Sequence, residues 1–78
     1  MRMEYDYRKM GQLIHRLRKE KGLSQEVLSG LANIGRTHLS MIETGSKNAS
    51  IETLWQLANA MNISMSTLFS YYETEYKD

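Results

Sequence analysis

The chain has 78 residues, a formal net charge of +1, and neither cysteine nor proline. A chain of this length forms one domain with a modest core, and the lack of cysteine excludes disulfides and thiolate metal sites. The longest apolar run is far shorter than the roughly 18 residues of a membrane span, and no signal peptide is visible. We therefore expect a cytoplasmic protein, with stability that dimerisation supplements.

Charge is distributed unevenly along the chain. Nine lysine and arginine residues stand against five acids up to Lys47, whereas one lysine stands against four acids from Asn48 onward. A basic first part and an acidic end predict that one face of the protein binds phosphates and that another face has a different role. The alternative is a solvated surface whose asymmetry has no function.

The first predicted element is a helix from about Tyr7 to Lys21, capped by Asp6. Its apolar residues recur at i, i+3, i+4 and i+7 and form an inward stripe of Met10, Leu13, Ile14 and Leu17. Gly22 is expected to end this helix in the left-handed conformation. Residues 1–7 are expected to form an N-terminal arm.

Two short helices and a tight turn are predicted over Ser24 to Glu43. Ser24 is a good N-cap, and Asn33, which tolerates the left-handed conformation, ends the first helix. The second helix begins near Gly35, and Ile34 plugs the space between the two. This spacing is typical of a helix-turn-helix motif. The polar side of the second helix has no role in a core, as a groove-reading helix requires.

Two further helices are predicted after a polar loop. Ser50 caps the fourth, which ends at Asn62, and Ser64 caps the fifth. The residues expected to face inward are Ile51, Leu54, Trp55, Ala58 and Met61 in the fourth helix, and Met65, Leu68, Phe69 and Tyr72 in the fifth. We divide the chain into an arm (1–7), a domain (8–72) and a tail (73–78).

The sequence resembles the Cro/C1-type, or XRE, helix-turn-helix family of phage and bacterial repressors. The matching residues include Gly22 to Glu26, Leu39-Ser40, Ile42-Glu43, Ser50 to Leu54, and Leu68-Phe69. Within that family, the run Arg36 to Ser40 is similar to the controllers of restriction-modification systems. The resemblance implies an all-α, compact five-helix bundle of the lambda-repressor-like type, bound to double-stranded DNA as a homodimer.

The resemblance also implies roles for single residues. The positions that face the major groove are Arg36, Thr37, Ser40 and Met41. Those that contact phosphates are Gln25, His38, Ser46, Lys47 and Asn48. The alternatives are a phosphate clamp at Arg36, a packed ring at His38 and a solvated loop at Ser46. Arg18 and Glu43 match a partly buried ion pair, so we interpret Arg18 as structural.

Four aromatic residues near the end of the chain are the predicted dimer interface, since aromatics are favoured at interfaces: Phe69, Tyr71, Tyr72 and Tyr76. A two-fold dimer places two recognition helices about 34 Å apart, one turn of DNA. The alternative is a frayed amphipathic end. Val27 and Leu31 stand where the family is usually polar, and either Met3 and Tyr5 or a partner is expected to cover them.

The sequence therefore predicts a sequence-specific DNA-binding regulator, most simply a repressor, of bacterial or phage origin. We expect no cofactor, no metal and no membrane, because His15 and His38 lack metal-ligand spacing, and an enzyme is the least expected class. The alternative is an antitoxin or other interaction module, in which Val27 and Leu31 or the tyrosine-rich end bind a toxin.

Overall fold

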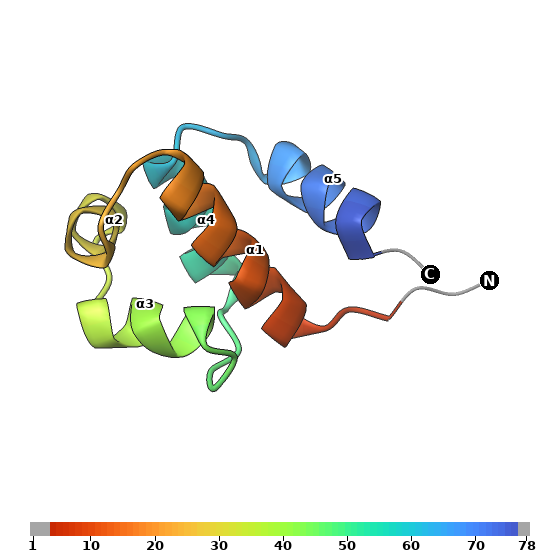
Figure 1. The fold of residues 1–78 in the computed structure, drawn as a ribbon, viewed down its shortest axis with the longest axis horizontal. Helices are drawn as coiled ribbons and strands as arrows, with labels where there is room; N and C mark the ends of the chain where they lie inside the picture. Colours follow the sequence, from red (N-terminus) through yellow and green to blue (C-terminus); the bar gives the residue numbers. More distant parts are fainter. Residues whose placement is uncertain (1–3, 77–78) are drawn as a thin grey trace.

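The computed structural model describes residues 4–76, which form five helices and no strand. The helices are α1 (Tyr7–Glu20), α2 (Gln25–Ala32), α3 (Arg36–Glu43), α4 (Ile51–Ala60) and α5 (Met65–Tyr76). Helix α2 packs on α3 and α4, while α1 packs on α3 and α5, so α2 and α3 lie at one side of the bundle and α5 at the other (Figure 1). The all-α fold predicted from the sequence is confirmed.

The helix boundaries follow from side-chain caps and left-handed residues. The side chains of Asp6, Ser24, Ser50 and Ser64 each accept a hydrogen bond of 2.9–3.0 Å from a backbone N–H two or three residues further on. These satisfy donors that the first turn of a helix leaves free. Asn33 has φ 58°, which reverses the chain between α2 and α3. All of these capping and turn predictions are confirmed.

The core is one cluster to which all five helices contribute. Every predicted inward residue of α1 is buried, and so are Leu28, Leu39, Ile42, Leu54, Leu57 and Leu68. The prediction was wrong for two residues of α4, because Ile51 and Trp55 are 67 % and 56 % exposed. Helices α2 and α5 cover the face of α4 that carries Leu54 and Leu57, and that leaves Trp55 on the opposite side.

The end of α5 departs from the predicted tail. The helix continues to Tyr76, so residues 73–76 are helical. The ring of Tyr76 packs against that of Tyr72, with 5.4 Å between centroids, and Tyr72 is only 3 % exposed. The buried aromatic contact extends the folded part of the chain beyond the expected boundary.

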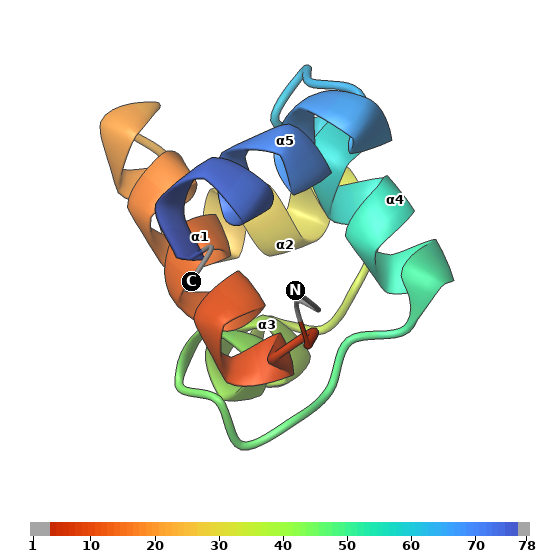
Figure 2. The same ribbon diagram turned by 90° about the vertical axis from the view of Figure 1, so that its right-hand side faces the viewer.

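The segment before α1 contacts α5, the helix that lies beside α1 in Figure 2. The rings of Tyr5 and Tyr72 lie 5.3 Å apart, and the backbone N–H of Asp6 donates to the Tyr72 hydroxyl at 2.8 Å. Tyr5 therefore does not cover Val27 and Leu31, which are 49 % and 62 % exposed. Met3, the other residue expected there, lies outside the described residues. None of the helices in residues 4–76 is both long and apolar enough to cross a membrane.

Candidate nucleic-acid interface

Helix α3 has one buried and one open face. Leu39, Ile42 and Glu43 are buried, whereas Arg36, Thr37 and Met41 are exposed and Ser40 is half-buried. The four residues predicted to face the major groove therefore share the open side of a short helix. Gly35, its N-cap, offers no side-chain hydrogen bond, so the first-turn N–H groups remain available to an acceptor.

Backbone contact holds α3 against α1. A Cβ atom added to Gly11 would lie 2.0 Å from the carbonyl oxygen of Ile42. Only glycine allows this approach, because no other residue lacks a Cβ. The position of the open face of α3 is thus determined partly by a residue in the middle of α1.

An ion pair links the end of α3 to α1. Arg18 donates from Nε to Glu43 Oε2 at 2.7 Å and from Nη2 to Oε1 at 3.0 Å. Its Nη1 donates to the carbonyl oxygen of Leu23 at 2.8 Å. Each of the two charged residues is 7 % exposed. Arg18 therefore lies inside the protein and is not available to DNA.

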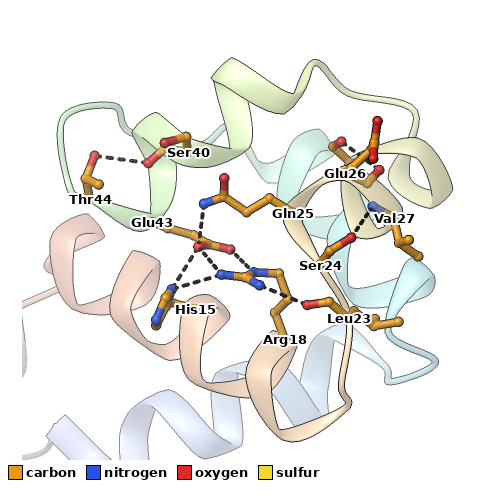
Figure 3. A network of polar contacts seen from close by, with 11 residues as sticks. His15, Arg18, Leu23, Ser24, Gln25, Glu26, Val27, Ser40, Glu43 and Thr44 are labelled. Carbon is orange, nitrogen blue, oxygen red and sulfur yellow. Dashed lines mark hydrogen bonds and ion pairs between the residues drawn. The ribbon is translucent and has the colours of Figure 1, made fainter.

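Two more side chains meet the same carboxylate (Figure 3). His15 Nδ1 lies 2.8 Å from Glu43 Oε1, and Gln25 Nε2 donates to that oxygen at 3.1 Å. Burial raises the pKa of Glu43, but the hydrogen bonds from Arg18, His15 and Gln25 outweigh it and hold the pKa below its usual range. The network orients Gln25 at the N-terminus of α2.

Sequence reasoning considered His15 only as a metal ligand and missed this contact. The available signal was its spacing, because His15 and Arg18 are i and i+3 on α1 and share a face. Among the described residues, no group of three histidine, aspartate or glutamate side chains is arranged to hold a metal ion.

Gln25 and Arg36, at the starts of two successive helices, are neighbours in the structure. Together with Thr37 and Ser40 they line a shallow hollow between the N-terminus of α2 and the open face of α3. The fold thus brings a predicted phosphate contact next to three predicted base contacts. His38 is half-buried and lies on the same short helix.

The loop after α3 carries the remaining predicted phosphate contacts. Ser46, Lys47 and Asn48 are exposed. The loop folds back on α3, since the backbone N–H groups of Ser46 and Lys47 donate to the Met41 carbonyl at 2.9 and 3.2 Å. The Ser46 hydroxyl donates to the same oxygen at 3.2 Å.

The four predicted dimer residues differ in how far the single chain buries them. Tyr72 is buried in the core of the single chain, so its assignment to an interface was wrong. Phe69 and Tyr76 are half-buried against that core, while Tyr71 is 42 % exposed. The structure adds Ile51 and Trp55 to the exposed apolar residues. Sequence reasoning missed them because it placed them inside.

Comparison with known proteins gives concordant results. A helix-turn-helix family model matches residues 14–68, well over half of the chain. The control protein C.MunI of a Mycoplasma species is 38 % identical over 68 residues, covering 86 % of this chain and 92 % of that protein. The transcriptional regulator y4dJ of Sinorhizobium fredii is 40 % identical over 60 residues, covering 76 % of this chain and 78 % of that protein.

Solved structures of restriction-modification controllers share the fold. C.AhdI of Aeromonas hydrophila is 39 % identical with a TM-score of 0.78, covering 82 % of this chain and 97 % of that one. C.Esp1396I, seen as a tetramer on its natural 35-base-pair operator, is 30 % identical with a TM-score of 0.86, covering 94 % of this chain and 96 % of that one. Sequence and structure agree that this chain belongs to the XRE-type, or Cro/C1-type, helix-turn-helix family.

Proposed function

We propose that the chain is a sequence-specific, double-stranded DNA-binding transcriptional regulator, most simply a repressor. It acts as a homodimer on a roughly palindromic operator, with α3 in the major groove. The open face of α3 carries this proposal: its polar residues have no role in the fold, while Leu39, Ile42 and Glu43 anchor the helix from behind. The known operator complexes of C.Esp1396I support it.

The exposed residues of α3 suit base contacts. Arg36 can donate to O6 and N7 of a guanine, a contact worth about 1–3 kcal/mol of discrimination. Thr37 and Met41 present methyl groups to thymine, and the Ser40 hydroxyl can donate or accept. An Arg36 bond to phosphate is the alternative, and it gives affinity without sequence preference.

Phosphate contacts would flank that face. Gln25 has a second amide N–H beyond the one donated to Glu43, and it lies at the N-terminus of α2, where backbone N–H groups favour anions. Lys47 and Asn48, in the loop after α3, are exposed and would contact the DNA backbone beyond the end of α3. His38 and Ser46 complete the proposed set of phosphate contacts. The Ser46 hydroxyl already donates its hydrogen to the Met41 carbonyl oxygen.

We revise the proposed dimer surface on the exposure of single side chains. Ile51 and Trp55, one turn apart on α4, replace Tyr72, and Tyr71 stays in the set. A hollow of about 380 Å³ beside Ile51 is lined mostly by apolar side chains, among them Tyr5 and Phe69. Burying these residues against a second copy removes the largest exposed aromatic side chain from water.

The finer assignment is a controller of restriction-modification genes in the bacterial cytoplasm. Its support is the match to C.MunI over 92 % of that protein, together with the solved controller structures. The proposal gives the chain no catalytic role, in line with a family and relatives named as regulators.

A second candidate, a toxin-binding antitoxin, is favoured by the exposure of Val27 and Leu31. It requires an apolar surface that stays open in the homodimer. A purified dimer that binds no duplex but captures a cognate toxin would support it.

Selection from a library of random duplexes, sequenced after rounds of binding at two salt concentrations, tests the proposed function. We expect an enriched palindrome and affinity that falls steeply with salt, because phosphate contacts release counterions. Weak binding without enrichment contradicts the proposal.

A further inference from the structure

Three side chains share one buried oxygen atom, Oε1 of Glu43 (Figure 3). His15 Nδ1 lies 2.8 Å from it, and Arg18 Nη2 and Gln25 Nε2 donate to it at 3.0 and 3.1 Å. A carboxylate oxygen has two lone pairs, so one of the three groups is bound less well than the others. The Gln25 bond is the longest, and it is therefore the one most easily lost.

The contact with Glu43 assigns a hydrogen to one nitrogen of His15. At 2.8 Å, an Nδ1 without hydrogen would set its lone pair against that of Oε1, so we assign the hydrogen to Nδ1. Arg18 Nη2, which is 3.2 Å from Nδ1, then cannot donate to it. His15 is thus a donor to Glu43 in both its neutral and its charged form, and the two forms differ in the strength of that bond.

The other ring nitrogen of His15, Nε2, is the place where the charge changes. The side chain is 50 % exposed, and Nε2 has no hydrogen-bond partner within residues 4–76. Histidine is the side chain that commonly gains or loses a proton between pH 5 and pH 8. A proton on Nε2 turns a neutral donor beside the Glu43 carboxylate into a charged one, and hydrogen bonds between two charged groups are the stronger ones.

Two charged groups contact the histidine ring. Glu43 of α3 favours its protonated form, whereas the guanidinium of Arg18 on α1 opposes that form. The side chain that joins the network from α2 is an uncharged amide. Helix α5 also packs on α1, but its Glu75 pairs with Arg16. The Glu43 carboxylate is therefore the acid to which the imidazole responds.

We propose that His15 is a positioning residue for the contact between Gln25 and a DNA phosphate. In its charged form, His15 takes the larger share of Oε1 and releases the Gln25 amide from Glu43. The released side chain then has both amide N–H groups available to a phosphate oxygen at the start of α2. DNA affinity consequently rises as the pH falls and His15 gains its proton. This inference rests on the proposed function.

The test measures the dissociation constant for the selected operator at fixed salt, between about pH 7.5 and about pH 5.5. We expect the unaltered protein to bind about 2- to 10-fold more tightly at the lower pH, which corresponds to one hydrogen bond. His15→Asn keeps an N–H donor without a titrating ring, so this gain should be absent. His38→Asn, the same substitution at the other histidine, is the matched control and should keep the gain, whatever its overall affinity.

A further variant separates positioning from simple charge. A charged imidazole attracts DNA through the general field of the protein, with or without Gln25. In Gln25→Ala, the gain at low pH should disappear if His15 acts through Gln25, and it should persist if His15 acts by charge alone. In NMR spectra of the free protein, the side-chain amide signals of Gln25 should shift over the same pH range, and they should stay fixed in His15→Asn.

The outcomes separate the inference from the proposed function. A gain that is absent in the unaltered protein, or retained by His15→Asn or Gln25→Ala, contradicts the inference alone. A Gln25 amide signal that does not change with pH also contradicts it, whether or not DNA is present. If no duplex is bound at any pH, the proposed function fails and this inference fails with it.

Discussion

Arg18 of α1 and Glu43, the last residue of α3, meet at two points, 2.7 Å from Nε to Oε2 and 3.0 Å from Nη2 to Oε1. Both residues are buried. A charge pair removed from water adds little stability relative to an apolar pair, but each charge depends on the other. The pair thus determines how α3 is held more than it strengthens the domain.

Glu43→Gln should destabilise the protein strongly. It leaves the Arg18 guanidinium buried without a counter-charge, and the expected loss in the free energy of unfolding is about 3–5 kcal/mol. Urea denaturation measures it. Glu26→Gln, an exposed change on α2, is the matched control and should stay within about 0.5 kcal/mol. A loss below about 1 kcal/mol for Glu43→Gln would show that water reaches the pair.

Stability should fall in acid partly through Glu43. Because its pKa is lower in the folded than in the unfolded state, the ionised carboxylate stabilises the fold above its ordinary pKa of about 4.3. That contribution is lost as the pH falls through the lowered, folded-state value. The difference in unfolding free energy between the unaltered protein and Glu43→Gln should therefore narrow below about pH 4. A difference that is the same at pH 3 and pH 7 would contradict the assignment.

Gly11→Ala should loosen α3. The added Cβ would overlap the Ile42 carbonyl at 2.0 Å, so the two helices must move apart, and overpacking of this kind costs about 1–3 kcal/mol. Thermal unfolding should show a lower Tm. A binding titration below that Tm should show weaker DNA binding. Gly30→Ala is the matched control, since its Cβ meets no atom. Equal effects of the two substitutions would mean that α1 and α3 do not touch as described.

The sequence was most informative where local chemistry decides the structure. Caps at Asp6, Ser24 and Ser50 and the left-handed turn at Asn33 depend on neighbouring residues only, so they could be predicted. The exposure of Trp55 could not be predicted, because α4 has apolar residues on more than one side and the packing of α2 and α5 selects Leu54 and Leu57 for burial. His15 was missed since its partner Glu43 comes from another helix. The DNA-contact residues came from the family resemblance, because the groups that they would bind belong to another molecule.

Arg36→Ala should relax specificity at one base position. If Arg36 bonds a guanine, the substitution should weaken the binding free energy for the selected operator by about 1–3 kcal/mol. The loss should be smaller for operators altered at that base. Lys47→Ala is the comparison: as a phosphate contact it should weaken all sequences alike and reduce the salt slope by about one. Binding titrations on single-base operator variants distinguish the two patterns. A uniform loss for Arg36→Ala would make it a phosphate contact.

Trp55→Asp should convert the dimer to a monomer. Trp55 is 56 % exposed on α4. A carboxylate there would lose its hydration when a second copy binds, and in a two-fold dimer both copies would bear this cost. Tyr71→Asp on α5 should act in the same direction, and sedimentation velocity over a range of concentrations measures both. Leu31→Asp, at a side chain with similar exposure on α2, is the control and should remain a dimer without DNA. If Leu31→Asp dissociates the free protein while Trp55→Asp does not, the dimer surface lies on α2.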